Sequence, residues 1–294
     1  ELGASPAISA RPMDFGLCYW GNDDRPGRGK YRLLLEGARF ADRNGFHAVW
    51  TPERHFHAFG GPYANPAVSG AAVAAVTERL HIRAASCVLP LHHPARVAEE
   101  WAMIDNLSDG RVGLGIAAGW QPDDFILRPE NAPPKSKGAM FRDIEVLRRL
   151  WRGEAVEFPR ADGTMHAVVT QPRPVQPEVP IWLTIALNPE SYEQAADIDA
   201  HVLTHLLGQS VDELAQKIRL YRGRLAERGE DPASGKVTLM LHTFVAPDRE
   251  RAREITREPL KRYLASAASL IKQYVLMFPA LKRPHGADAP ENID

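Results

Sequence analysis

Residues 80–117 read LHIRAASCVLPLHHPARVAEEWAMIDNLSDGRVGLGIA, and this stretch decides the fold. Two apolar runs, residues 80–89 and 111–117, flank a segment over 94–107 whose pattern predicts a helix. A Ser-Asp-Gly turn at 108–110 separates this helix from the second run. A strand, a helix and a second strand in this order predict a βαβ unit, in which the two strands are parallel.

The same alternation extends on both sides of this unit. Seven strand-like segments alternate with helical ones, and strands such as VPIWLTIA at 179–186 are apolar along their whole length, as in a parallel sheet covered on both faces. We therefore predict an α/β fold, a (β/α)₈ TIM-type barrel, with a doubly wound sheet as the second choice. The expected strands are 13–20, 47–51, 80–89, 111–117, 179–186, 201–206 and 236–245, and the expected helices are 30–44, 65–77, 94–107, 139–151, 189–197, 211–228 and 249–270.

The predicted domain organisation is simple. Residues 1–12, ELGASPAISARP, are small, polar and Pro-containing, so we interpret them as a linker, a tag remnant or the cut end of a longer chain. Residues 13–294 are predicted to form a single barrel domain, with a hairpin insertion near 154–170. Residues 271–294 offer only YVLMF before a Pro-rich end, so the final β/α unit is expected to be lacking or irregular.

Composition excludes several classes of function. The 294 residues carry 36 Lys and Arg against 37 Asp and Glu, so no global positive field is available for nucleic acid or a membrane surface. The longest apolar run is far shorter than a membrane span requires. The two cysteines, Cys18 and Cys87, lie in strand-like apolar surroundings, which indicates no disulfide framework. Without a recognisable signal peptide, these features predict a reducing, cytoplasmic compartment.

In a parallel barrel, functional side chains gather where the strands end. The segment TPERHFHAFGG follows the second predicted strand and places Glu53, Arg54, His55 and His57 together. One interpretation is a His-x-His metal site, a second is a polar rim around a planar cofactor, and a third is an ordinary hydrogen-bonded loop. The other ligands of a metallohydrolase are not evident, so we assign no metal.

Other strand ends add weaker signals. VGLGIAAGW at 112–120 does not open a helix, so it is not a dinucleotide fingerprint, although its glycines leave room for a flat ring. Asn188 and Pro189 begin a helix whose free N–H groups can hold a phosphate. Aromatic residues at the strand ends predict an apolar substrate pocket, with rim packing as the plainer alternative. These are Tyr19, Trp20, Phe56 and Trp120.

The order of these motifs resembles the bacterial luciferase-like flavin monooxygenases. The resemblance is carried by FADRNGFHAVWTPERHF, by the stretch from RAASCVLPLHHPARV to GIAAGW, by PIWLT followed by NPESY, and by HVLTHLLGQ. It covers most of residues 13–221. ERHFHAFGGPYANP and GWQPDDF are most similar to the subgroup associated with polyketide and nonribosomal peptide assembly lines.

The resemblance implies roles for individual residues. Glu53 matches an acidic residue near the flavin, Arg54 stands where luciferases carry their catalytic His, and His55 matches the second His of that motif. Because imidazole titrates nearest to neutral pH, His55 is the candidate proton donor, and Arg54 is placed beside it in the catalytic set.

Cofactor-binding positions follow from the same comparison. Ala85 and Ser86 match a pair that has a cis peptide bond in luciferase. Ala118 falls where luciferases place a flavin-binding Arg, and Gly119 follows it. The turn Ala186-Leu187-Asn188 matches the phosphate side, where many relatives have Gly in place of Leu187.

The implied activity is that of an FMN-dependent monooxygenase. It would bind FMN reduced by a separate flavin reductase, form a C4a-peroxyflavin with O₂, and act by hydroxylation or Baeyer–Villiger oxygen insertion. The implied substrate is a polyketide or peptide intermediate tethered to an acyl or peptidyl carrier protein, and a homodimer is possible. The alternatives are a catalytically silent barrel with a structural or docking role, a deazaflavin-dependent oxidoreductase, and a barrel metallohydrolase built on His55 and His57.

Overall fold

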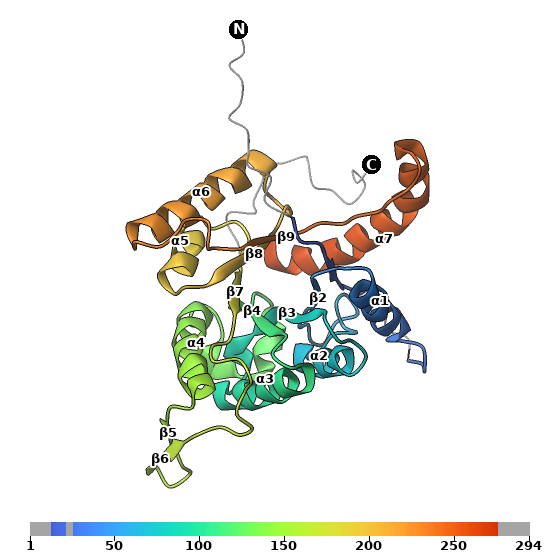
Figure 1. Cartoon of the computed structure of the whole chain (residues 1–294). Helices are drawn as coiled ribbons and strands as arrows, with labels where there is room; N and C mark the ends of the chain where they lie inside the picture. The colour runs from blue at the N-terminus through green and yellow to red at the C-terminus, as the bar shows by residue number, and fades with distance from the viewer. Residues whose placement is uncertain (1–12, 22–25, 276–294) are drawn as a thin grey trace.

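The computed structural model describes residues 13–21 and 26–275, which form a nearly closed α/β barrel (Figure 1). Seven parallel strands lie side by side in the order β1-β2-β3-β4-β7-β8-β9. Their bounds are β1 Gly16–Cys18, β2 Ala48–Thr51, β3 His81–Val88, β4 Val112–Ala117, β7 Ile181–Thr184, β8 His201–His205 and β9 Val237–Met240. The predicted TIM-type fold is confirmed, and the doubly wound alternative is wrong because the sheet curls towards closure instead of reversing its strand order.

The two ends of the sheet approach each other across a seam. Within the described residues, β9 and β1 share no strand pairing. The Sγ atom of Cys18 nevertheless lies 3.6 Å from the Sδ atom of Met240, so side chains from the first and last strands meet. Both cysteines are free, as predicted. Of residues 271–294, where the final β/α unit is expected to be lacking or irregular, 276–294 lie outside the described part of the chain, as do residues 1–12.

The helices pack outside the barrel and connect successive strands (Figure 1). Two of them begin where side-chain capping predicts. Asn65 accepts N–H groups at the start of α2 with Pro66 as its first residue, and Ser210 and Glu213 form a capping box on α6. The helices are α1 Arg32–Arg43, α2 Pro66–Ala74, α3 Pro94–Ser108, α4 Ser136–Arg152, α5 Glu190–Asp197, α6 Val211–Glu227 and α7 Arg249–Val275.

Several predicted boundaries differ from the structure, and three differences matter most. The segment between the fourth expected strand and the helix expected at 139–151, where the sequence indicates no regular element, contains the short 3₁₀ helices η2 (Pro122–Leu127) and η3 (Pro129–Asn131). Each begins at a proline, and a third such helix, η1, spans Leu89–Leu91. The last predicted strand ends at Met240 and not at 245, because its partner β8 ends at His205, opposite Met240. The segment YVLMF is not a new strand at its start, since α7 continues to Val275.

Two apolar regions stabilise the barrel. The larger one lies between the sheet and its helices, and a smaller cluster of Ala48, Trp50, Ala85, Trp182 and Leu203 alternates with it along the strands and fills the inside. The predicted hairpin is the antiparallel pair β5 (Val156–Pro159) and β6 (Met165–Val168), which extends away from the helices (Figure 1).

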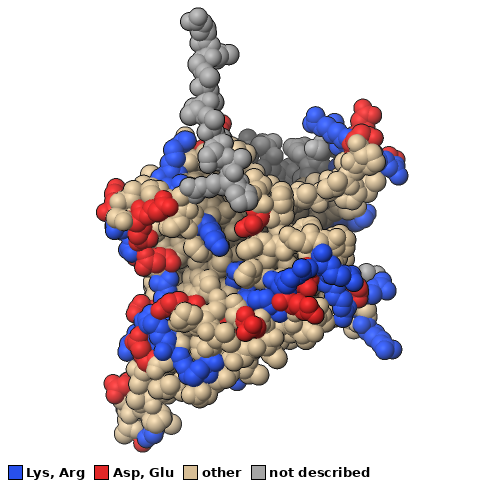
Figure 2. All heavy atoms as spheres, in the orientation of Figure 1, with Lys and Arg blue, Asp and Glu red and all other residues tan. Residues whose placement is uncertain are grey.

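The charged surface agrees with the balanced composition. Lys and Arg side chains alternate with Asp and Glu over the face seen in Figure 2, without a large area of one sign. No helix in the described part of the chain has the length and apolar character needed to cross a membrane.

Candidate active site at the carboxyl ends of the strands

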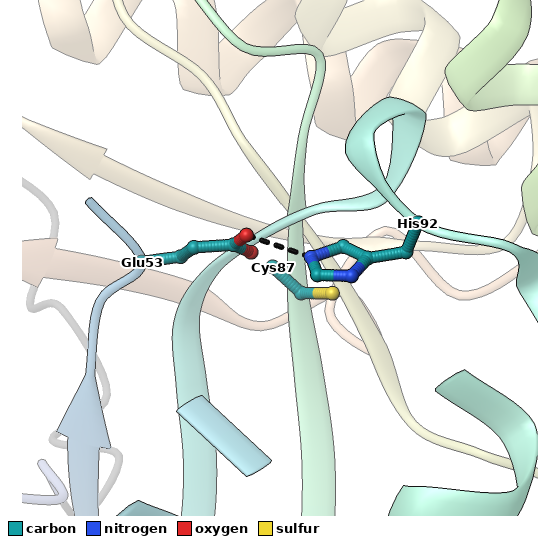
Figure 3. A group of neighbouring side chains, drawn as sticks. All are labelled: Glu53, Cys87 and His92. Carbon is teal, nitrogen blue, oxygen red and sulfur yellow. Dashed lines mark hydrogen bonds and ion pairs between the residues drawn. The ribbon is translucent and has the colours of Figure 1, made fainter. Parts of the chain in front are cut away.

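A buried carboxylate with two imidazoles lies at the carboxyl end of β2. Oε1 of Glu53 is 2.8 Å from Nε2 of His55 and 2.7 Å from Nε2 of His92, and Oε2 accepts the backbone N–H of Val88 at 2.7 Å. The Glu53 side chain is fully buried, whereas His55 and His92 are 13 % and 21 % exposed. Figure 3 shows Glu53 and His92 facing each other from different loops.

The hydrogen bonds determine the protonation of this group. Burial by itself would raise the pKa of Glu53, but the hydrogen bonds from His55, His92 and Val88 outweigh it and hold that pKa below its ordinary value. Burial would likewise lower the pKa of His92, yet the hydrogen bond to Glu53 raises it. An ionised carboxylate can only accept, so both imidazoles carry a proton on Nε2 and donate it to Glu53. Nδ1 of His55 is then the nitrogen that can take up or release a proton.

This group also contains the closest approach to a metal site. The ligand atoms of Glu53, Cys87 and His92 lie within 4.8 Å of one another (Figure 3). Both oxygens of Glu53 already accept N–H groups, and burial raises the pKa of the Cys87 thiol well above its ordinary value. Glu53 and His92 are therefore hydrogen-bonded to each other beside a protonated Cys87, and they do not offer the free carboxylate and thiolate that a cation prefers.

The His-x-His hypothesis is not supported by the geometry. His55 donates to Glu53, whereas Nδ1 of His57 accepts the N–H of Phe59 within its own loop. Phe56 between them has φ of +55°, so the segment turns sharply and is not extended. The two imidazoles consequently do not form the pair on which the metallohydrolase alternative depends.

The side chain of Arg54, which is predicted to belong to the catalytic set beside His55, is buried in an ion pair. Its side chain is 1 % exposed, and Nη1 lies 2.5 and 2.6 Å from the two oxygens of Asp124 in η2. The guanidinium also stacks over Trp120 at 5.5 Å. Nε and Nη2 of Arg54 are buried without a hydrogen-bond partner in the described structure. Arg54 thus ties the loop after β2 to the loop after β4.

Strands β3, β4 and β7 form the base of the opening at the carboxyl end of the barrel, which we call the mouth. The pairing of β3 with β4 shifts register between Ala84 and Cys87, which makes Ala85 and Ser86 a bulge. The cis peptide implied at this pair is not found, since the cis bonds of the described residues precede Pro134 and Pro172. Ser86 Oγ accepts the N–H of Glu53, and Thr184 of β7 donates to the carbonyl of Ala85 at 2.7 Å.

Gly115 makes the contact between Thr184 and the carbonyl of Ala85 possible. A Cβ on Gly115 would lie 2.5 and 2.9 Å from the carbonyl oxygens of Ala84 and Ala85, so only Gly allows the bulge to approach β4 this closely. Gly119, with φ of +79°, has the same character, since a Cβ there would meet Val88 and Phe125 below 3 Å. Gly115 lies within β4 beside the bulge, and Gly119 follows the end of that strand.

The turn after β7 is open. Ala186 and Asn188 are exposed, and Asn188 Oδ1 accepts the N–H of Glu190 at the start of α5. The side chain of Leu187 lies beside Gly208, because a Cβ built on Gly208 would be 3.5 Å from both of its methyl groups. Leu187 therefore leans towards the loop after β8 and packs against it.

The structure brings most of the expected residues to one end of the barrel. They lie at or after the ends of four adjacent strands, β2, β3, β4 and β7. These residues are Glu53, His55, the bulge, Ala118, Gly119 and the 186–188 turn. Trp120 and Phe56 are 38 % and 65 % exposed at the rim. Trp20 packs on Phe59 at 5.4 Å, with its Nε1 buried and unpartnered within the described residues.

Tyr19 differs from the other expected pocket residues. It lies outside the sheet, where its hydroxyl donates to the carbonyl of Leu33 on α1 and its ring lies 6.5 Å from that of Tyr63. Two further residues, His92 and Asp124, join the site without having been expected. His92 could have been noticed because it follows the third strand closely, but nothing in the sequence pairs Asp124 with Arg54.

Comparison with known proteins agrees with this geometry. The family model described as luciferase-like monooxygenase matches residues 13–291. The oxygenase component of a flavin-dependent trigonelline monooxygenase from Acinetobacter baylyi is 30 % identical over 246 residues, 81 % of this chain and 65 % of that protein. The 4-hydroxyprotoasukamycin monooxygenase of Streptomyces nodosus is 30 % identical over 237 residues, 78 % of this chain and 63 % of its own. The chain thus spans somewhat less than two thirds of the length of these relatives.

A solved structure extends the comparison to the fold. The crystal structure of monooxygenase RslO1 from Streptomyces bottropensis superimposes with a TM-score of 0.79 at 28 % identity, over 89 % of this chain and 80 % of that one. The family model, the relatives and the barrel therefore agree that the chain belongs to the luciferase-like monooxygenase family.

Proposed function

We propose that this chain is the oxygenase of a two-component, FMN-dependent monooxygenase. A separate flavin reductase supplies reduced FMN, and the chain uses it with O₂ to hydroxylate its substrate or to insert oxygen beside a carbonyl. The observation that carries the proposal is the Glu53–His55–His92 network, which holds one imidazole nitrogen ready for proton transfer at the carboxyl end of the barrel. The relative described as a flavin-dependent oxygenase component supports the same assignment and the need for a reductase.

The residues at the mouth fit a flat ring with an anionic tail. Nε and Nη2 of Arg54 and the indole Nε1 of Trp20 are buried without partners in the described structure, so these donors remain available there. Gly119 lets the backbone after β4 pack closely against Val88 and Phe125, and Leu187 leans towards Gly208, beside the exposed Ala186 and Asn188. Ala85, Ser86, Ala118 and Gly119 would hold the ring, and the 186–188 turn would hold the phosphate.

FMN, when bound, supplies the activation of oxygen, and the protein contributes orientation and proton control. Glu53 fixes the ring orientation and tautomer of His55 through the Nε2–H bond, which leaves Nδ1 as the atom that exchanges a proton. His92 shares the carboxylate, so it helps to keep Glu53 ionised. The Arg54–Asp124 ion pair positions Trp120 over the same side of the mouth and limits the access of water.

The rim favours an apolar substrate that reaches the mouth from outside. Phe56, Trp120, Leu187 and Leu207 surround it, and Phe56 and Leu207 are more than half exposed. We propose a polyketide or peptide intermediate carried by an acyl or peptidyl carrier protein, because a tethered chain can enter such an open rim while its carrier stays outside. Exposed apolar residues on α2 and α3, namely Val68, Met103 and Leu107, support a homodimer through these helices.

The test is an anaerobic titration of the purified chain with reduced FMN, followed by oxygen consumption with a carrier-bound acyl substrate. We expect saturable binding and substrate-dependent oxygen uptake. The variant His55→Gln should lower turnover by roughly 100-fold with little change in FMN binding. His57→Asn is the matched control, since His57 lies in the same loop but outside the Glu53 network.

Three results would count against the proposal. Failure to bind FMN in either redox state would favour a structural or docking barrel. Binding of a deazaflavin with hydride transfer and no oxygen uptake would identify a reductase. Equal turnover in His55→Gln and the parent chain would remove His55 from the mechanism.

A further inference from the structure

The opposite end of the barrel holds a group of basic side chains that the proposed function does not use. His47 directly precedes β2, His81 begins β3, His201 begins β8 and Lys236 directly precedes β9. The rings of His47 and His81 lie 4.6 Å apart, and the ring of His201 lies 4.8 Å from Trp182. Since parallel strands start at the same edge, these residues gather at the amino ends of the strands. Together with Arg83 we call them the amino-end cluster.

Arg83 is the buried centre of this cluster. It follows His81 by two residues on β3, is 4 % exposed and stacks 4.7 Å over Trp182 inside the barrel. Its Nη1 donates to the carbonyl of Val112 at the start of β4, which directs the guanidinium towards the amino end. A Cβ on Gly113 would collide with Nη1, so this glycine provides the space that the guanidinium occupies.

The hydrogen bonding of Arg83 is incomplete. Its Nε is buried without a partner in the described structure, and so is Nε1 of Trp182, on which it stacks. Arg111 shows what a satisfied buried arginine looks like in the same barrel. Its guanidinium donates to the carbonyls of Ser108, Leu80 and Thr77 and to the Thr77 hydroxyl. Arg83 instead has one carbonyl acceptor and no ion-paired carboxylate among the described residues.

Arg83 lies among imidazoles that are mostly neutral at pH 7, with Lys236 as a further positive charge. Burial lowers the pKa of Arg83 to about 10, which still leaves it charged at neutral pH. Burial, together with the charges of Arg83 and Lys236, lowers the pKa of His81 and of His201 to about 4. The acid that faces the cluster is Asp14, whose carboxylate lies 3.8 Å from Nδ1 of His47 and is largely exposed.

We propose that the amino end of the barrel binds a small oxyanion, either a phosphate or sulfate ion or the carboxylate of a small acid. A buried guanidinium without a counter-charge is costly, and an oxyanion supplies both the charge and the acceptor atoms that Arg83 lacks. Lys236 and the partly exposed imidazoles form the rim through which the ion reaches Arg83. This site is independent of the flavin assignment, because it lies at the other end of the strands.

The experiment uses the full chain at pH 7 and constant ionic strength, with FMN added so that its own phosphate occupies the carboxyl end. Phosphate, sulfate and acetate are titrated against chloride, and binding is followed by calorimetry and by the thermal unfolding midpoint. Imidazole NMR signals of His81 and His201 provide a local readout. We expect an oxyanion to raise the midpoint and to raise the pKa of both imidazoles, and the ranking of phosphate against acetate to identify the preferred class.

Variants locate the binding. Arg83→Met should weaken oxyanion affinity by at least about tenfold, the value expected for the loss of a charged hydrogen bond. Arg96→Gln removes one positive charge from the exposed surface of α3 and should leave the affinity unchanged. If Arg83→Met does not fold, Lys236→Gln takes its place, with the same direction of change.

The proposal fails if the three oxyanions act like chloride, or if the variant at Arg83 or at Lys236 titrates as the parent chain does. It also fails if the imidazole signals of His81 and His201 do not respond to any of the three ions. Because FMN binding is measured separately, a failure here leaves the monooxygenase assignment untouched, and the reverse also holds.

Discussion

The two ends of this barrel treat a buried charge in opposite ways. At the carboxyl end, Glu53 accepts three N–H groups and is fully paired. At the amino end, Arg83 is almost equally buried but donates to a single carbonyl. Buried charges are tolerated when they are paired and hydrogen-bonded, so Glu53 is satisfied within the protein, whereas Nε of Arg83 lacks a hydrogen-bond acceptor in the described structure. Burial alone therefore does not show that a charged group needs a ligand, whereas an unsatisfied hydrogen-bond donor does.

The largest effect on stability is expected when the hydrogen-bonded carboxylate of Glu53 is replaced. Glu53→Gln replaces an oxygen that accepts N–H groups with an NH₂ group that faces other donors, either Val88 N–H or the two imidazoles. We expect a loss of about 3 kcal/mol in the free energy of unfolding, measured with urea at pH 7. Glu100→Gln is the control, because Glu100 pairs with the exposed Arg96. A loss below about 1 kcal/mol, the range of a surface pair, would contradict this account.

The two ends should also respond to pH in opposite directions. The pKa of His81 and of His201 falls from 6.5 unfolded to about 4 folded, so the unfolded chain takes up protons first and stability is lost as pH falls from 6.5 to 4. The pKa of His92 is raised, so its contribution is present below 6.5 and is lost as pH rises through the folded value.

Variants separate these two limbs of the pH profile. His81→Gln/His201→Gln should flatten the acid limb between pH 6.5 and 4, and His92→Gln should flatten the limb above 6.5. The measurement is the free energy of unfolding from urea titrations at half-unit pH steps. If each variant alters the limb assigned to the other, the assignment of the two ends is wrong.

A smaller effect on stability is expected when Arg83 at the amino end is replaced. Arg83→Met removes a buried charge that has no ion-pair partner in the described structure, so little is lost. In chloride buffer we expect the free energy of unfolding to change by no more than about 1 kcal/mol, or to rise. Urea unfolding beside Glu53→Gln provides the comparison. A loss as large as that of Glu53→Gln would show that Arg83 is already satisfied.

The smallest effect concerns backbone strain at the carboxyl end. Phe56 is 65 % exposed and has φ of +55°, a region that disfavours side chains with a Cβ. Phe56→Gly should raise the free energy of unfolding by about 0.5–1 kcal/mol, while an apolar substrate binds more weakly because the aromatic rim is lost. Phe40→Gly, an exposed change within α1, should be destabilising by a similar amount.

Much of the fold could be predicted from the sequence because each strand and helix carries its own pattern. Continuous apolar strands and caps such as Asn65 and Ser210 are local features. The position of His55 beside Glu53 was also within reach, since both follow the same strand. His92 and Asp124 were not, because their contacts depend on the bulge in β3 and on η2, which no local pattern indicates.

The amino-end cluster was missed for a different reason. Functional side chains of barrels usually follow the strands, so residues that precede a strand lie outside the region where a site is expected. His47, His81, His201 and Lys236 all stand at strand starts and are visible in the sequence. Period-two alternation of His81, Arg83 and Ala85 would also have placed Arg83 inside the barrel.

The Arg54–Asp124 ion pair restricts the route by which molecules can enter and leave the mouth. Because it joins the loops after β2 and β4 deep below the surface, those loops can separate only by exposing two unpaired charges. These two loops therefore form a rigid side of the mouth that does not open. In the monooxygenase that we propose, substrate and product therefore pass on the other side, where Leu187 and Leu207 border the loops after β7 and β8.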